Sequence, residues 1–155
     1  MTKNLRLRIA SSQAVLTLLL FAGLVPAAAA ADYNVSTLRY ENKGGYTAGV
    51  AVRYGKCSIG RWVVVGKGST VDYKLGANNP EWEDKDCKNG PQLGDEVWMT
   101  IEIEFGDKQS CRKDSTKFYY NGTDGGTVKY VTKGTTLNNN RCQIASKPSD
   151  DHIIQ

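Results

Sequence analysis

The sequence predicts an all-β fold, an antiparallel β-sandwich built from about seven or eight short strands and held by two disulfides. Three observations lead to this prediction. Apolar and polar residues alternate with a period of two in several segments. Turn-rich pieces such as NKGG, FGDK and KGTTLNNN separate these segments. No stretch beyond residue 31 keeps a helical period, and that part of the chain holds all the cysteines.

The chain begins with a segment that has the three-part layout of a secretory signal peptide, residues 1–31. A basic start, MTKNLRLR, precedes an apolar run from Ala14 to Pro26 and the small-residue stretch AAAAAD. The apolar run is shorter than the roughly 20 residues that a spanning helix needs, and a retained amphipathic anchor is the alternative interpretation. We therefore expect a bacterial protein that is secreted or periplasmic, with no transmembrane segment in its mature form.

The mature chain is expected to form one domain, residues 32–145, followed by a flexible tail, residues 146–155. Lys3, Arg6 and Arg8 lie in the leader, so 17 of the 20 basic residues remain against 16 acidic residues. This nearly neutral balance differs from the basic stripe or high pI of nucleic-acid-binding domains. Nucleic acid is therefore not expected as a partner, and the sequence does not indicate the oligomeric state.

Three segments show strict alternation and are predicted to be half-buried strands: residues 97–105, 46–54 and 69–75. In the first, VWMTIEIEF, one face is apolar and the opposite face begins with Trp98 and Thr100. The predicted inward residues are Val97, Met99, Ile101, Ile103 and Phe105 in the first segment, Tyr46, Ala48, Val50, Val52 and Tyr54 in the second, and Val71, Tyr73 and Leu75 in the third.

Weaker strand signals occur in five further segments, and together with the three clear ones they favour an immunoglobulin-like architecture. This is an expectation about architecture alone, because the Cys, Trp, Cys core pattern of immunoglobulin domains is not matched. The weaker segments are residues 36–41, 61–65, 116–121, 126–131 and 141–144.

The four cysteines are Cys57, Cys87, Cys111 and Cys142. An even number of cysteines in an exported chain favours disulfides. Their spacings of 30, 24 and 31 residues do not resemble the closely paired cysteines of a zinc site. Three pairings are possible, and we favour Cys57 with Cys87 and Cys111 with Cys142, because each bridge closes a moderate loop and the two loops do not interlock. Each bridge is expected to contribute about 3 kcal/mol.

No motif indicates catalytic residues. The single histidine, His152, lies in the predicted tail, where it lacks the rigid neighbours that a general base needs. Glu102 and Glu104 share a strand face about 7 Å apart, but they are better explained as a solvated face matched by basic residues on neighbouring strands. We therefore expect no enzyme, and a hydrolase with paired carboxylates is the least favoured alternative.

Trp98 is the first candidate for a binding site. The alternation assigns Trp98 and Thr100 to the solvent face, and an exposed aromatic ring on a sheet face is a common platform for a sugar ring or a partner. The alternative is that the loop carrying Trp82, or the N-terminal strand, covers the ring. The candidate ligand-binding residues are therefore Trp98, Trp82 and Thr100.

The stretch PEWEDKDC, residues 80–87, is the second candidate. Calcium takes six to eight oxygen ligands, and the carboxylates of this stretch could supply several of them. The spacing and the glycine of an EF-hand loop are absent, and Lys85 lies inside the cluster, so a solvated loop held by Cys87 is the favoured interpretation. No other cofactor is expected. The four carboxylates are Glu81, Glu83, Asp84 and Asp86.

These observations favour a secreted, non-catalytic binding protein whose ligand is a carbohydrate or another protein. The alternative is a secreted effector, toxin or inhibitor that acts on a host or competitor protein or on a membrane. Fold class alone does not assign a function, because sandwiches host many unrelated activities.

Overall fold

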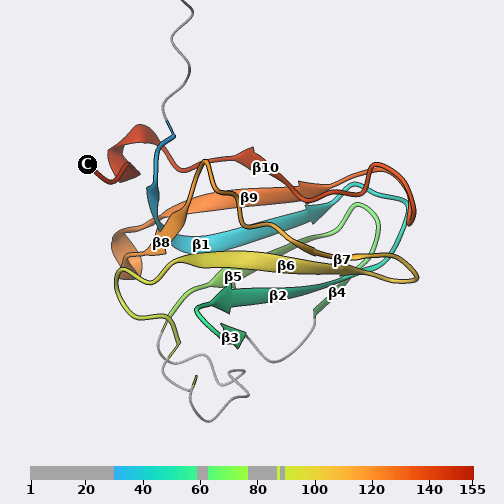
Figure 1. Ribbon diagram of the computed structural model, residues 1–155, viewed down its shortest axis with the longest axis horizontal. Coiled ribbons are helices and arrows are strands. Elements are labelled where there is room, and N and C mark those ends of the chain that lie inside the picture. Colours follow the sequence, from blue (N-terminus) through green and yellow to red (C-terminus); the bar gives the residue numbers. More distant parts are fainter. Residues whose placement is uncertain (1–29, 59–62, 77–86, 88–89) are drawn as a thin grey trace, which may run out of the picture.

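The described part of the chain folds almost entirely into β-strands (Figure 1). The computed structural model describes residues 30–58, 63–76, 87 and 90–155. Nearly all of the predicted signal peptide lies outside the described residues. No helix in the described ranges is both long enough and apolar enough to cross a membrane.

Two sheets of five strands each make up the described fold. The β1 sheet consists of β1 (Tyr33–Asn42), β5 (Thr70–Lys74), β8 (Phe118–Tyr120), β9 (Gly126–Thr132) and β10 (Gln143–Ser146). The β2 sheet consists of β2 (Ala48–Tyr54), β3 (Cys57–Ser58), β4 (Val63–Val65), β6 (Val97–Ile103) and β7 (Lys108–Ser110). The two short 3-10 turns are η2 (Gly122–Asp124) and η3 (Asp150–His152).

Each sheet has a main path of four strands, and a fifth strand pairs with a strand inside that path. The β1 sheet has the order β10-β9-β1-β5, with β8 paired to the start of β1. The β2 sheet has the order β3-β2-β6-β7, with β4 paired to β2. The alternation does not predict β3 or β7, because strands of two or three residues are too short to show a period.

The alternation correctly predicts which side of β2 and β6 is buried. The two strands pair in antiparallel register, from Ala48 opposite Ile103 to Tyr54 opposite Val97, and all the predicted inward residues within them are buried. The prediction for Phe105 is wrong, because β6 ends at Ile103 and Phe105 is 91% exposed in the turn that follows.

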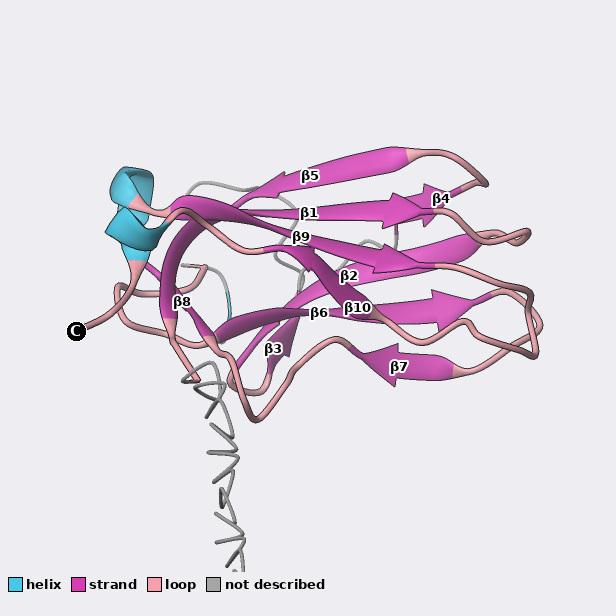
Figure 2. Ribbon diagram, turned by 90° about the horizontal axis from the view of Figure 1, so that it is seen from above, coloured by secondary structure: helices cyan, strands magenta, loops and turns pink. Residues whose placement is uncertain are grey.

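The two sheets lie on opposite sides of one apolar core (Figure 2). Burial of apolar surface at roughly 25 cal/mol per Å² is the main favourable contribution to such a fold. The mostly β fold with two sheets around a common core is thus confirmed. Fully buried contributors are Val35, Leu38, Tyr40, Val128 and Tyr130 from the β1 sheet and Val50, Val52, Met99 and Ile101 from the β2 sheet.

The predicted antiparallel pairing is wrong for part of the β1 sheet. β5 runs antiparallel to β1, whereas β8 and β9 run parallel to it. β1 and β9 come from opposite ends of the domain, so no hairpin sets their relative direction, and the long intervening chain supplies the crossover that a parallel pair requires. A register shift between Val35 and Thr37 divides β1 into a part that pairs with β8 and a part that pairs with β9.

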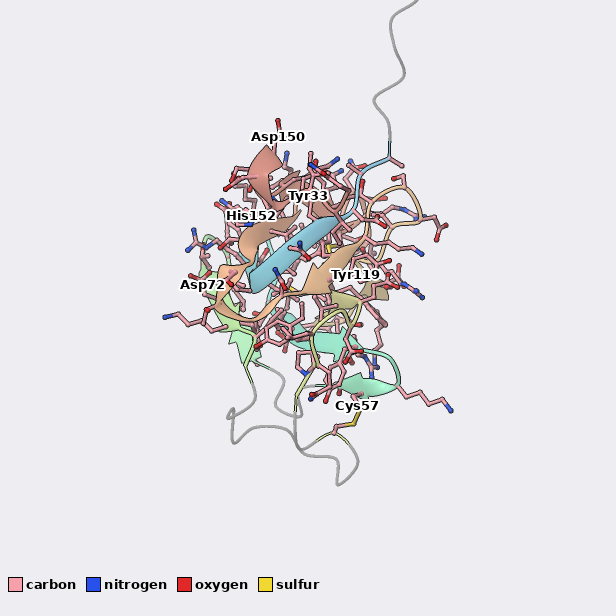
Figure 3. All side chains as sticks on the ribbon, turned by 90° about the vertical axis from the view of Figure 1, so that its left-hand side faces the viewer. Tyr33, Cys57, Asp72, Tyr119, Asp150 and His152 are labelled. Carbon is pink, nitrogen blue, oxygen red and sulfur yellow. A yellow bond between two sulfur atoms is a disulfide. The ribbon has the colours of Figure 1, made fainter. Side chains whose placement is uncertain are left out.

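The end of the chain packs against the start of β1. We expected residues 146–155 to be a flexible tail, but Ile153 forms a β-bridge with Tyr33 and packs against the core. A Cβ atom added to Gly126 of β9 would lie 2.7 Å from His152, which shows how closely η3 approaches this strand. Figure 3 shows His152 and Tyr33 at the same end of the molecule. These residues are therefore part of the packed domain.

Both disulfides have the predicted pairing, Cys57 with Cys87 and Cys111 with Cys142. Cys57 belongs to β3 and lies near one edge of the molecule in Figure 3. Cys111 directly follows β7 and Cys142 directly precedes β10, which are edge strands of the two different sheets. The second disulfide therefore closes one side of the two layers.

Two buried tyrosines predict how the fold responds to alkaline pH. Burial raises the pKa of Tyr40 to about 12 and also raises the pKa of Tyr130 above its ordinary value. The unfolded chain loses these protons near pH 10, so between pH 10 and 12 the folded state binds more protons than the unfolded state. The free energy of unfolding should therefore be unaffected by these groups below about pH 9 and fall as the pH rises through 10 to 12.

Circular dichroism followed against pH measures this alkaline unfolding. The Tyr130 hydroxyl has no hydrogen-bond partner among the described residues, so Tyr130→Phe removes the titrating group without breaking a hydrogen bond. This variant should unfold at a higher pH than the parent. If the pH at the midpoint of unfolding stays the same in Tyr130→Phe, the Tyr130 hydroxyl does not contribute to alkaline unfolding.

Candidate functional site

The outer face of the β2 sheet holds the two residues predicted for a sheet-face site. Trp98 lies opposite Arg53 of β2, and Thr100 lies between Ala51 of β2 and Ser110 of β7. Trp98 is half-buried, and Thr100 is only 7% exposed. The alternation thus identifies the face away from the core, but these two side chains are not freely exposed on it.

Arg112 covers the Trp98 ring. Its guanidinium carbon lies 4.9 Å from the ring centroid, within the range of a cation–π contact. The Glu96 carboxylate holds the guanidinium in place, because Arg112 Nε donates to Glu96 Oε1 at 2.6 Å and Nη2 donates to the second oxygen. A ligand that stacked on Trp98 from this side would have to displace Arg112.

The acidic stretch predicted as a calcium site, with Trp82 beside its carboxylates, lies in residues 77–86, outside the described residues. Cys87 at its end is described; it is buried, joined to Cys57, and its carbonyl accepts a hydrogen bond from the Tyr54 hydroxyl at 2.8 Å. Within the described ranges, no group of three or more His, Cys, Asp or Glu side chains is placed to hold a metal ion. The calcium site stays a prediction.

A polar groove of about 780 Å³ lies between β7 and the loop that joins β9 to β10. One wall comes from residues 107–113 and the other from residues 133–143. The lining includes five side-chain amides and four cationic side chains, and we call it the amide groove. Its volume falls in the usual range of small-molecule sites, but its polar lining fits a polar ligand. The amides are Gln109, Asn138, Asn139, Asn140 and Gln143.

Gln109 connects the two walls of the amide groove. It lies on β7 opposite Ile101, with its side chain on the core side of this edge strand. Its Nε2 donates to Asn140 Oδ1 at 2.9 Å, and its Oε1 accepts from the Cys142 amide at 2.9 Å. Together with the disulfide to Cys142, these bonds hold the walls in one arrangement, which reduces the ordering cost of binding.

Backbone geometry shapes the loop wall of the amide groove. Gly134 has a φ of 82°, and a Cβ atom there would lie 2.3 Å from the Asn138 carbonyl oxygen, so this position requires glycine. Asn139 has a φ of 58°, a left-handed conformation that asparagine tolerates better than most residues. The Thr135 amide closes the turn by donating to the Asn138 carbonyl at 2.9 Å. Asn138 and Asn139 are thereby presented to solvent.

The charge of the amide groove is positive. Asp107 is its one acidic lining residue. One of its lysines, Lys108, also forms an ion pair at 4.0 Å with Glu102 on the solvated face of β6. The excess of cations favours an anionic ligand and raises its local concentration. The cationic lining residues are Lys108, Lys113, Lys133 and Arg141.

A second, shallower hollow of about 540 Å³ lies on the outer face of the β2 sheet. Gly49 contributes to its lining, together with Val64 of β4, Glu102, and Phe105 in the turn after β6. Val64 is 68% exposed. This hollow therefore differs from the amide groove in having two exposed apolar side chains at its border.

Sequence reasoning missed the amide groove. Residues 133–140, KGTTLNNN, are predicted as a turn because glycine and asparagine are common in turns. The run NNNR directly before Cys142 is the one signal that could have indicated a polar wall, once the pairing of Cys142 with Cys111 is assumed. The opposing wall is formed by β7, which is too short to show alternation.

Comparisons with known proteins assign no family to this chain. No protein-family model, no curated protein and no solved structure matches it. The function must be inferred from the side chains, and the amide groove is the candidate site within the described residues. It combines a concave shape, a polar lining, and walls joined by hydrogen bonds and a disulfide.

Proposed function

We propose that this protein is a secreted, non-catalytic binding protein that holds an acidic carbohydrate in the amide groove. One observation carries the proposal: amide and cationic side chains line a groove whose walls are joined by Gln109 and by the Cys111–Cys142 disulfide. Such a fixed polar surface supports the binding of a polar ligand.

The side chains of the amide groove match the chemistry of an acidic sugar. A side-chain amide both donates and accepts hydrogen bonds, as a sugar hydroxyl does. Lysine and arginine donate hydrogen bonds and carry positive charge, so they suit a carboxylate, sulfate or phosphate substituent. Most of the lining residues are exposed along the groove. An extended saccharide chain therefore fits better than a small molecule that must be enclosed.

Features outside the groove support an extracellular or periplasmic setting. The leader-like first 31 residues and the two disulfides fit an oxidising compartment. The two sheets around one core support a β-sandwich as the working architecture, and the immunoglobulin-like arrangement stays a prediction.

Replacing Lys133 and Arg141 with alanine together should weaken binding of an acidic glycan by about tenfold or more, because each lost charge-assisted hydrogen bond costs on the order of 1 kcal/mol. A glycan array of neutral and acidic saccharides, probed with the oxidised protein in calcium and again in EDTA, identifies a ligand. Titration calorimetry of parent and variant with that ligand measures the change.

The matched control replaces Lys56 and Lys74 with alanine. Both residues are exposed and lie outside the amide groove, so this variant has the same net charge change. It should bind the glycan like the parent. Equal losses in both double variants would mean that overall charge, not the groove, holds the ligand. Binding that Trp98→Ala abolishes, while Lys133→Ala with Arg141→Ala leaves it intact, would place the site on the β2 sheet. Loss in EDTA would implicate the acidic stretch.

A further inference from the structure

Phe105 has an unusual position in the turn between β6 and β7. Among the described residues it is the most exposed of the large apolar side chains, at 91%. Its φ is 59°, in the left-handed region that is unfavourable for a bulky residue. The Gly106 amide donates to the Ile103 carbonyl at 2.8 Å, so Phe105 occupies the third position of a four-residue turn, where a positive φ normally selects glycine.

Neither local conformation nor burial accounts for phenylalanine at this position. The chain keeps an aromatic side chain where glycine would fit the backbone better, and it exposes that side chain to water. A local conflict of this kind is expected at functional positions. A single exposed apolar residue would need no explanation. A functional surface is indicated only if other exposed apolar side chains lie near Phe105.

Two further exposed apolar side chains lie near Phe105. Val64 borders the same hollow on the β2 sheet. Leu137, which is 79% exposed, follows Thr136, and a Cβ atom on Gly106 would lie 2.7 Å from the Thr136 carbonyl oxygen. The turn that holds Phe105 and the loop that holds Leu137 therefore touch, and both belong to the end of the molecule opposite the C-terminus (Figures 1 and 2).

Hydrogen bonds join the loops at this end into one platform. Gly45 N donates to Gly134 O at 2.9 Å, Glu104 N donates to Thr47 O at 2.9 Å, and Gly68 N donates to Asn42 O at 2.7 Å. Apolar tips from separate loops are thereby held in fixed positions. The four loops, residues 43–47, 66–69, 104–107 and 133–142, contain the basic residues Lys43, Lys67, Lys133 and Arg141 and the acidic residues Glu104 and Asp107.

We infer that this end of the molecule docks on a lipid bilayer that contains anionic phospholipid, with Phe105 and Leu137 entering the interfacial region. Phe105 and Leu137 are exposed on separate loops, an arrangement that suits insertion into a bilayer surface better than burial in a flat protein contact. Leu137 shares its surroundings with Lys133 and Arg141, and the four loops together carry four basic against two acidic residues. Exposed apolar side chains with an excess of basic residues are the combination that binds an anionic membrane interface. The inference goes beyond the proposed carbohydrate binding. The two surfaces share Lys133, Leu137 and Arg141, which also line the amide groove, but vesicle binding is measured without any glycan.

Co-sedimentation of the oxidised protein with vesicles tests the inference. Vesicles of phosphatidylcholine with phosphatidylglycerol should bind the parent, and vesicles of phosphatidylcholine alone should bind it more weakly. Phe105→Gly should reduce partitioning by roughly tenfold or more, because one phenylalanine no longer enters the interface. Its thermal unfolding midpoint should be no lower than that of the parent, because glycine suits the positive φ. Leu137→Ala should reduce partitioning about fivefold.

Leu93→Ala provides the matched control. Leu93 is 72% exposed, and its side chain lies near Gly122 at the other end of the molecule. This variant should bind vesicles like the parent. The inference is overturned if the parent protein binds neither kind of vesicle. It is also overturned if Phe105→Gly and Leu137→Ala bind vesicles as well as the parent does. A dimer that Phe105→Gly abolishes in sedimentation velocity, without vesicle binding, would also overturn it and assign the surface to a second copy of the chain.

Discussion

Replacing Cys111 and Cys142 with alanine should lower the free energy of unfolding by about 3 to 4 kcal/mol and abolish ligand binding in the amide groove. The bridge spans 31 residues, and closing a loop of this length constrains the unfolded chain by about that amount. It also fixes the groove wall, because the Cys142 amide donates to Gln109 and Asn140 lies two residues away. Urea unfolding and glycan titration measure the two effects.

The other disulfide is a matched control for this experiment. Cys57 and Cys87 are 30 residues apart, so replacing both with alanine should cost a similar amount of stability. This pair contributes no residue to the amide groove. Under conditions where both variants remain folded, binding should survive in this variant and be lost in the other. Equal affinities of the two variants would show that the groove does not need its disulfide.

Replacing Asn42 with alanine should lower the free energy of unfolding by about 3 kcal/mol or more. Asn42 is fully buried at the end of β1. Its Nδ2 donates to the Tyr46 carbonyl at 2.6 Å and to the Val65 carbonyl at 3.0 Å, and its Oδ1 accepts from the Gly44 amide at 2.9 Å. Alanine would leave all three buried backbone groups without this partner, and the hydrogen bond that joins β1 to Val65 of the β2 sheet would be lost.

Asn138→Ala is the comparison for this variant. Asn138 is exposed in the loop between β9 and β10, so its substitution should change the free energy of unfolding by no more than about 0.5 kcal/mol. Chemical denaturation of both variants gives the difference. A cost near zero for Asn42→Ala would mean that water replaces its side chain and that the three hydrogen bonds do not stabilise the fold.

Local patterns predicted the strands well and their partners less well. The inward residues of β2 and β6 could be read from alternation, because successive side chains of a strand point to opposite faces. The exposed position of Phe105 could not be predicted from alternation, because alternation does not show where a strand ends. The parallel pairing of β1 with β9 could not be predicted from alternation either, because strand direction depends on how the whole intervening chain crosses the core.

The candidate sites illustrate the same division. Trp98 was correctly assigned to the outer face of its strand, but its cover comes from Arg112, which a separate turn of the chain brings over the ring. The amide groove joins two segments that lie about twenty residues apart in the sequence. Neither segment alternates strongly, and exposed amides and lysines also occur in ordinary loops. Only their juxtaposition marks them as a site.

The sequence by itself determined that the chain is rich in strands and which side of the longer strands is buried, and among three possible cysteine pairings it favoured the one that the structure shows. The strand properties follow from the period of two along a strand, and the preference for one pairing follows from the lengths of the loops between cysteines. The tertiary structure decided the direction of β8 and β9, the cover of Trp98, the exposure of Phe105 and the existence of the amide groove. Each of these depends on which distant segments meet when the two sheets pack. A pattern within one segment does not show which other segment it will contact.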